Sequence, residues 1–363
     1  MPLITRRDVG QFLIGSLPGP SVSAEWRSLT REFDCGGMIL FDRNIEEAEQ
    51  VAELAQQIQS LGRSMPAWVS VDQEGGRVAR LRQPFTEWPP MMTLGRSGSE
   101  DLATRFARAL ASELRAVGVT LNYAPVLDVH TNPKNPVIGD RALGDRAGEV
   151  ARLGSAIVTA LQQSGVAACG KHFPGHGDTS VDSHRELPII EHPPDRLRAT
   201  EFEPFRAAVA ANVTFIMTAH VLVTSVDDAR PATLSAAVLR LLRDDLAFAG
   251  AIVSDDLEMQ ALGGYGSVPE VAIDAIRAGC DALLVCSGDV NVQAATLEAL
   301  VRAFESGSIP TSRWDDAFTR LRRAKERFLT GNTMVTPERR RELAKLLGRD
   351  EHQAVASEMA AFL

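Results

Sequence analysis

The sequence lacks several features that would place the protein in a specialised class. It has no apolar run of about 18 residues, the length that a membrane-spanning helix needs. It also has no glycine-rich phosphate-binding loop of the GxGxxG or Walker type. A net charge of −9 and the lack of a Lys/Arg stripe interleaved with aromatic residues argue against a phosphate-backbone binder. We therefore expect no nucleic acid and no membrane among its partners.

Cysteine is scarce, and the cysteines form no pattern. Cys35, Cys169, Cys280 and Cys286 lie far apart without CxxC spacing, and most of them lie in apolar runs. Such residues are typical of reduced core thiols rather than of a disulfide framework. The apolar run at 12–17 is too short for a signal peptide and has no small-residue cleavage site. We expect a cytoplasmic protein that is monomeric and needs no cofactor.

Apolar runs and helical stretches alternate along the chain. Its 363 residues, of which 45% are hydrophobic and 23% charged, allow two average domains or one large barrel. The eight runs lie at 10–17, 37–41, 67–71, 120–127, 167–172, 215–221, 249–254 and 282–286. The candidate helices lie at 23–32, 45–61, 99–117, 147–164, 196–211, 235–246, 268–278 and 291–306. Eight strand-helix pairs predict an α/β protein of the (β/α)8 TIM-barrel type rather than an open sheet.

The sequence from Pro310 onward is helical and charged. We predict that residues 1–309 form the barrel and that residues 310–363 form additional helices packed on it. Its basic residues are expected on a solvated face: Arg320, Arg322, Arg323, Lys325, Arg339, Arg340, Arg341 and Lys345. No linker rich in Pro, Gly or Ser and no internal repeat indicates a second globular domain.

Polar residues gather where the predicted strands end. They are Asp72 after the third run, Asp128 and His130 after the fourth, Lys171 and His172 at the fifth, His220 in the sixth, and Asp255 and Asp256 after the seventh. The C-terminal ends of barrel strands carry the active site in proteins of this type. The sequence therefore predicts one site at the mouth of the barrel.

The densest polar segment is KHFPGHGDTSVDSH, at 171–184, which holds three of the seven histidines. Side chains two positions apart in an extended segment point the same way, so Asp182 can orient His184 and stabilise its cation. This spacing indicates an acid/base dyad. The alternative is a metal site. The possible zinc or iron ligands are His172, His176, Asp178 and His184.

Two adjacent carboxylates, Asp255 and Asp256, follow the run at 249–254. Neighbours on a strand point in opposite directions, so one should face the mouth while the other caps a helix or binds backbone amides. A buried aspartate at a strand end, kept ionised by nearby lysine and arginine, is suited to attack an electrophilic carbon. One of the pair is therefore a candidate nucleophile.

The segment VSVDQEGGRVARL, at 69–81, adds a third group of polar residues. Asp72 ends a strand and can accept hydrogen bonds from two hydroxyls, as sugar recognition requires. A Gly-Gly pair then permits a tight turn. Arg77 and Arg80 lie within reach of the mouth, although Arg77 is expected to face solvent.

Four segments in this order resemble glycoside hydrolase family 3, in particular its β-N-acetylhexosaminidases of the peptidoglycan-recycling type. The segments are VDQEGGRVARL, LNYAPVLDV, KHFPGHGDTSVDSH and SDDLEM. The likeness covers roughly 37–287. It implies a retaining enzyme that removes terminal β-linked N-acetylglucosamine from peptidoglycan fragments such as anhydro-muropeptides.

The resemblance also implies roles for individual residues. Asp255 corresponds to the nucleophile that forms a covalent glycosyl-enzyme, and His184 to the acid/base group, assisted by Asp182. The implied sugar-binding residues are Asp72, Arg80, Arg141, Lys171 and His172. The sequence departs from the family near Arg141, where IGDRAL lacks the aromatic residue that often follows the arginine.

The residues by themselves support this reading and leave alternatives open. A retaining glycosidase needs a nucleophile and a proton donor. Glu74 and Glu258 are also candidate donors, but Glu74 lies in a turn beside arginines and Glu258 at the start of a helix. His184 is preferred because an ordinary imidazole pKa of about 6.5 suits proton donation and return near neutral pH. Phosphorolysis on the same scaffold, a metal-dependent hydrolase and a non-catalytic sugar-binding module are the alternatives.

Overall fold

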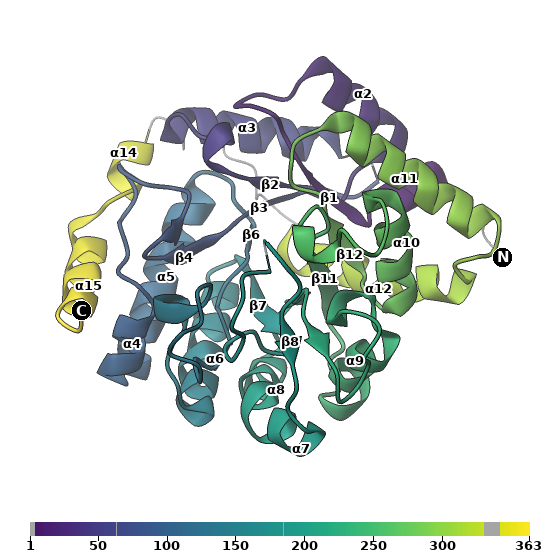
Figure 1. Ribbon diagram of the computed structural model, residues 1–363. Helices are drawn as coiled ribbons and strands as arrows, with labels where there is room; N and C mark the ends of the chain where they lie inside the picture. Colours follow the sequence, from purple (N-terminus) through teal and green to yellow (C-terminus); the bar gives the residue numbers. More distant parts are fainter. Residues whose placement is uncertain (1–3, 63, 184, 330–341) are drawn as a thin grey trace.

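The computed structural model describes residues 4–62, 64–183, 185–329 and 342–363. Its centre is a closed barrel of eight strands in which every neighbouring pair is parallel (Figure 1). The strands are β1 (Leu13–Ser16), β2 (Gly37–Leu40), β3 (Trp68–Val71), β6 (Leu121–Asn122), β7 (Ala167–Phe173), β9 (Phe215–Thr218), β11 (Ala251–Asp256) and β12 (Ala282–Leu284). Each lies in or overlaps one of the predicted runs, so the predicted (β/α)8 barrel is confirmed.

A helix follows each strand and packs on the outside of the barrel (Figure 1). These helices are α2 (Ala24–Phe33), α3 (Ala48–Leu61), α5 (Glu100–Ala116), α6 (Ala147–Gln163), α8 (Phe202–Ala210), α9 (Ala236–Arg240), α10 (Val268–Ala278) and α11 (Val290–Glu305). All eight were predicted. The predicted stretches at 196–211 and 235–246 contain π-helical turns at Leu197–Glu201 and Leu241–Asp245. None of the described helices has the length and apolar character needed to cross a bilayer.

The sequence of α5 shows why these segments are helical. Leu102, Phe106, Leu110 and Leu114 recur every four residues, and all four are buried. This spacing places them on one face of an α-helix. The Ser99 side chain accepts a hydrogen bond from the backbone N–H of Leu102 and so caps the first turn. Periodicity and capping therefore agree with the fold.

The first predicted run begins too early. A short helix, α1 (Arg6–Gly10), precedes β1 and includes Gly10. Thr5 and Asp8 form a reciprocal capping box at its start. A helix of five residues is too short to show a period, so only the cap could have revealed it.

The loops at the C-terminal ends of the barrel strands contain two short strand pairs. β4 (Gln73–Gly75) and β5 (Val78–Ala79) form an antiparallel hairpin after β3, and β8 (Ile189–Ile190) pairs with β10 (Leu222–Val223). Gly75 and Gly76 both have positive φ angles, 116° and 56°, which confirms the predicted tight turn. This turn directs the chain back over the barrel mouth.

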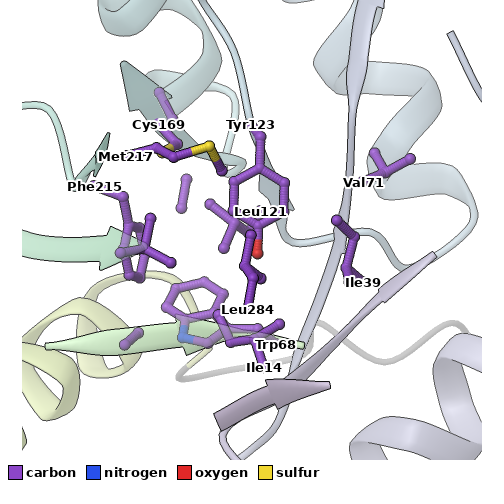
Figure 2. Close-up of a cluster of buried hydrophobic side chains, with 14 of the residues drawn as sticks. Ile14, Ile39, Trp68, Val71, Leu121, Tyr123, Cys169, Phe215, Met217 and Leu284 are labelled. Atoms are coloured by element: carbon purple, nitrogen blue, oxygen red, sulfur yellow. The ribbon is translucent and has the colours of Figure 1, made fainter. Parts of the chain in front are cut away.

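The barrel interior is a packed core rather than a pore, as Figure 2 shows. Trp68 meets Phe215 edge to face, with ring centroids 5.4 Å apart, and the Tyr123 hydroxyl donates to Ser70 Oγ at 3.1 Å. Cys169 lies among these side chains. All four cysteines are buried and unpaired, so the prediction of core thiols is confirmed. A filled interior restricts ligand binding to the ends of the barrel.

Three further helices follow the barrel: α12 (Thr311–Phe328), α14 (Leu343–Leu346) and α15 (Asp350–Ala360). The Phe328 ring lies 6.4 Å from the Trp68 ring, so α12 reaches the N-terminal ends of the strands. α14 and α15 contact α5, and α15 also contacts α4 (Met92–Ser97) (Figure 1). The division of the chain at residue 310 remains a prediction.

The prediction that the basic residues of this region are solvated is wrong for Lys325. Its side chain is almost fully buried, and Nζ donates to Gln11 Oε1 at 2.6 Å. Arg320 is also withdrawn from solvent and lies 3.3 Å from Asp281. Arg339, Arg340 and Arg341 lie outside the described residues. Long side chains on α12 therefore pack and form hydrogen bonds at the closed end of the barrel, and not only at the surface.

Burial lowers the pKa of Lys325 to about 7, against an ordinary value of 10.5. Between these two values the unfolded chain binds more protons than the folded protein, so stability rises with pH across this window. Below pH 7 the lysine is charged in both states. The folded protein is then destabilised by the full free-energy cost of burying this charge.

We expect Lys325→Met to raise the melting temperature most at about pH 6 and to lose this advantage towards pH 10, because methionine carries no charge to bury. The loss of a partner for Gln11 opposes the gain at every pH. Calorimetry at several pH values measures the difference. Lys345→Met, at a side chain that is 79% exposed, is the matched control. A difference that does not vary with pH would contradict this account.

Candidate active site

A cavity of about 190 Å³ opens at the C-terminal ends of the barrel strands. Its polar lining comes from several strands and loops: Asp72, Arg80, Arg141, Lys171, His172, His176, Ser183, Asp255 and Asp256. All five predicted sugar-binding residues and the predicted nucleophile therefore meet in one place. Their chemical roles remain predictions. Asp182 lies in the loop after β7, and its partner in the predicted dyad, His184, lies outside the described residues.

A network of buried charges forms one wall of the cavity. Lys171 Nζ lies 2.7 Å from Asp72 Oδ1 and 2.6 Å from Glu74 Oε1. The Arg141 guanidinium binds both oxygens of Glu74, at 2.8 and 2.9 Å. The side chains of Lys171 and Glu74 are at most 3% exposed. Glu74 thus joins two of the predicted sugar-binding cations and holds each in place.

Glu74 is ionised in this network and has no proton to give. Burial raises its pKa, but the charges and hydrogen bonds of Arg141 and Lys171 outweigh burial and bring the pKa well below its ordinary value. Glu258, the other carboxyl considered as a donor, accepts a hydrogen bond from the Ser287 backbone N–H at 2.7 Å. The sequence did contain a signal for Glu74. It lies two positions from Asp72 in an extended segment and therefore on the same face.

Arg80 closes the cavity on the side of β2. Its guanidinium lies 3.6 Å from Asp42, whose side chain is 73% exposed, and 5.6 Å from the centre of the Phe41 ring. Its Nε is buried and has no hydrogen-bond partner among the residues that the structure describes. A buried donor without a partner is costly, so this position favours a ligand that accepts a hydrogen bond. Arg77, by contrast, is half exposed and pairs with Asp140 at 3.3 Å.

Asp255 and Asp256 have different hydrogen-bond partners, but both line the cavity, so the prediction that only one of them faces the mouth is wrong. The pairing of β11 with β12 shifts register between Val253 and Asp256, which interrupts the regular alternation of side chains. Asp256 Oδ1 accepts hydrogen bonds from the backbone N–H groups of Glu258 and Cys286, at 3.1 and 3.2 Å. Asp256 therefore binds backbone amides of the following segment and of the end of β12, whereas Asp255 accepts the N–H of its neighbour Asp256. Burial raises the pKa of Asp256 to about 7, and the nearby Glu258 and Asp255 charges add to this rise.

Asp255 is kept ionised. Burial raises its pKa, but the charges of His220 and His172, the Asp256 backbone N–H at 2.8 Å and Lys171 together bring the pKa below its ordinary value. The sequence predicts lysine and arginine in this role, and of these Lys171 contributes. Histidines from β7 and from the end of β9 are the main contributors instead. An ionised carboxylate in a partly dry cavity is equipped for nucleophilic attack.

His172 is oriented by a buried carboxylate that the sequence had not assigned. Its Nδ1 lies 2.7 Å from Asp128 Oδ2, and Asp128 Oδ1 accepts the backbone N–H groups of His172 and His176. Asp128 is fully buried, yet its pKa is lowered, because these contacts outweigh the effect of burial. A carboxylate on one ring nitrogen fixes the direction of the other. His172 is therefore a rigid part of the cavity wall.

His176 and Asp178, two of the residues predicted as metal ligands in the alternative interpretation, form hydrogen bonds or ion pairs with other side chains. His176 lies between Thr179 Oγ1, at 2.6 Å, and Ser183 Oγ, at 3.1 Å. Asp178 pairs with His192 and accepts the Thr131 hydroxyl at 3.0 Å. Within the described ranges, no three His, Cys, Asp or Glu side chains are grouped so that they could hold a metal ion. The structure thus does not assemble the predicted ligand set from its described members.

His220 was noted only as a polar residue at a strand end, but it has a defined electrostatic role. Its Nε2 lies 2.8 Å from the Asp256 carbonyl oxygen and its Nδ1 lies 2.7 Å from Thr233 Oγ1. A carbonyl only accepts, so Nε2 donates. The Thr233 hydroxyl also lies within hydrogen-bond distance of the Ala219 carbonyl oxygen and of Thr218 Oγ1. The His220 imidazole lies close enough to Asp255 to help lower the pKa of that carboxyl.

Comparison with known proteins agrees with this geometry. Residues 5–324 match the family model described as the N-terminal domain of glycosyl hydrolase family 3. A β-hexosaminidase of Nitrosomonas eutropha is 43% identical over 259 residues, which are 69% of this chain and 74% of that protein. A β-hexosaminidase of Tolumonas auensis is 37% identical over 334 residues, which are 87% of this chain and 99% of that protein.

Solved structures give the same result. A glycoside hydrolase family 3 β-N-acetylglucosaminidase from Paenibacillus sp. FPU-7 has a TM-score of 0.90 and 40% identity, covering 99% of this chain and 69% of that one. NagZ from Neisseria gonorrhoeae, solved with N-trifluoroacetyl-D-glucosamine, has a TM-score of 0.79 and 32% identity over 97% of each chain. The resemblance noted in the sequence is therefore confirmed. The chain belongs to glycosyl hydrolase family 3, among its NagZ-type β-N-acetylhexosaminidases.

Proposed function

We propose that the protein is a retaining exo-β-N-acetylglucosaminidase that removes terminal β-linked N-acetylglucosamine from peptidoglycan fragments such as anhydro-muropeptides. The observation that carries the proposal is an ionised Asp255 in a small cavity whose other polar groups suit a sugar. The packed barrel core closes the bottom of the cavity, so a glycan can enter only with its terminal residue. This favours exo action on one terminal residue.

Double displacement follows from these groups. Asp255 attacks the anomeric carbon, the glycosidic C–O bond breaks, and the leaving oxygen takes a proton from the acid/base group. That group then removes a proton from water, which displaces Asp255 and releases N-acetylglucosamine with its β configuration retained. We assign the acid/base role to His184 with Asp182, on the strength of the family motif.

The charge network supports sugar binding by preorganisation. Lys171 holds one oxygen of Asp72 at 2.7 Å, so the direction of this carboxylate is set before a sugar enters. We propose that the other oxygen accepts sugar hydroxyl protons, and that Arg80, through its unpartnered Nε, donates to the sugar. His172, held by Asp128, completes the set. Groups fixed in advance lose little entropy when the substrate binds.

Trapping with a mechanism-based fluorosugar that carries a 2-acetamido group tests the proposal. We expect one label, on the peptide that contains Asp255. A label on another residue, or none in an enzyme that turns over the substrate, would refute the nucleophile. Product analysis in phosphate buffer separates hydrolysis from phosphorolysis, and we expect the free sugar rather than a sugar 1-phosphate. Comparison of a GlcNAc-anhydro-muropeptide with chitobiose measures the preference for peptidoglycan fragments.

His220→Gln should lower kcat by about tenfold to a hundredfold and raise the apparent pKa of the acidic limb of the pH profile, because the His220 imidazole helps to lower the pKa of Asp255. A pH series of kcat/KM with an aryl N-acetylglucosaminide measures both effects. His192→Gln, a histidine that pairs with Asp178 away from the nucleophile, is the matched control and should not move the acidic limb. A purely structural role for His220 would lower activity equally at every pH.

We also propose that the protein acts in the cytoplasm as a monomer. Four buried, unpaired cysteines are compatible with a reducing compartment. Light scattering of the purified protein against its 39.2 kDa mass tests the oligomeric state.

A further inference from the structure

A second cavity, of about 240 Å³, lies at the opposite end of the barrel from the active site. It is bounded by the residues just before β9 and β11 and by α12. Val213 and Phe248 contribute apolar surface. Arg320, Arg323 and Arg327 lie along the same cavity at intervals of three and four residues, which places them on one face of the helix.

Among the described residues, three arginines at this end have the same buried carboxylate as their ion-pair partner. Asp281 is fully buried and is the acceptor for Arg243, Arg313 and Arg320. Three positive charges thus share one negative charge. Burial lowers the pKa of Arg243, and repulsion from Arg320 and Arg313 contributes to the fall. The cluster therefore has a positive excess before any surface residue is counted.

Two more arginines increase this excess at the rim. Arg327 donates to the Asn212 carbonyl at 3.1 Å, and within the described part of the chain neither Arg323 nor Arg327 forms an ion pair. The whole chain has a net charge of −9, so a local concentration of positive charge is not a general property of its surface. Such a concentration beside a concave apolar wall attracts anions.

We propose that this cavity binds a phosphate monoester, with its phosphate group on Arg323, Arg327 and Arg320 and its apolar part against Val213 and Phe248. Guanidinium groups present planar pairs of donors that match phosphate oxygens, and these charge-assisted bonds are stronger than neutral ones. The site is independent of the glycosidase chemistry, since none of its residues lines the active-site cavity.

Calorimetric titration of the full chain with phenyl phosphate and with inorganic phosphate, at constant ionic strength, tests the proposal. Saturating N-acetylglucosamine keeps the active site occupied. We expect saturable 1:1 binding, with phenyl phosphate tighter than inorganic phosphate because only the ester reaches the apolar wall. Equal affinity for the two would reduce the site to one for free phosphate and overturn the monoester assignment.

Variants of the cavity arginines test whether the ligand binds in this cavity. The double variant Arg323→Ala/Arg327→Ala should weaken the binding of phenyl phosphate by about tenfold or more. This is the loss of affinity expected when one or two charge-assisted contacts are removed. Arg322→Ala, on the same helix but outside the cavity and paired with Glu326, should bind as the wild type does. Both variants should keep wild-type melting temperatures without ligand. Undiminished binding by the double variant, or equal losses in both variants, would refute the site.

Discussion

Replacement of Asp255 by Asn is expected to lower kcat by about a thousandfold or more, because the amide keeps the shape of the carboxylate but cannot form the glycosyl-enzyme. The fold should be preserved. Asp255 has its own backbone contact with the Asp256 N–H, at 2.8 Å, which an amide oxygen can also accept. Steady-state kinetics with an activated aryl N-acetylglucosaminide measure the loss. Activity within tenfold of the wild type would show that another residue is the nucleophile.

Asp256→Asn is the matched control for this variant. The pKa of Asp256 is raised to about 7, so the residue is largely neutral in slightly acidic solution, and an asparagine oxygen can still accept the Glu258 and Cys286 amides. We expect its kcat to stay within about tenfold of the wild type. Asp255→Ala with added azide provides a second readout. A glycosyl azide of α configuration is expected, because azide attacks in place of the missing carboxylate.

Replacement of Glu74 by Gln should have the largest effect on stability. It leaves Lys171 and Arg141 buried with one partner fewer, and loss of one member of a buried ion pair typically costs about 3 to 5 kcal/mol. KM should also rise, because both cations contact the cavity that we assign to the sugar. Urea unfolding and kinetics measure the two effects. Asp42→Asn, which removes an exposed partner of Arg80, is the control and should change stability by less than about 1 kcal/mol.

A double variant separates charge balance from sugar binding. Glu74→Gln/Arg141→Met removes both members of one ion pair, so much of the lost stability should return. Activity should not return, because a predicted sugar-binding cation is gone. Recovery of both properties together would show that Arg141 has no part in binding the substrate.

Much of the fold could be predicted because the signals are local. Eight apolar runs alternate with amphipathic helices, and each run contains or overlaps one barrel strand. The exceptions have physical causes. α1 is a five-residue helix without a readable period. Lys325 was placed in solvent by its charge, whereas its long side chain reaches Gln11 under the barrel.

The candidate site was predicted less completely. The family motif named Asp255 and the five proposed sugar-binding residues, all of which line the cavity, whereas strand alternation wrongly turned one of Asp255 and Asp256 away from it. The motif did not reveal which charges meet, because Glu74, Asp128 and His220 act through partners that lie between 36 and 97 residues away along the chain. Pairing of that kind depends on the register of neighbouring strands and loops.

The sequence by itself determined the barrel, the end of it that carries the site, and the family to which the chain belongs. These follow from periodicity, strand-end positions and motif order, all of which act over short distances along the chain. Only the tertiary structure decided that Glu74 joins Lys171 to Arg141 and that His220 lies between Thr233 and the Asp256 carbonyl, close to Asp255. It also revealed the arginine-lined cavity at the closed end. Charge balance and proton positions depend on distances through space, which the folded barrel alone establishes.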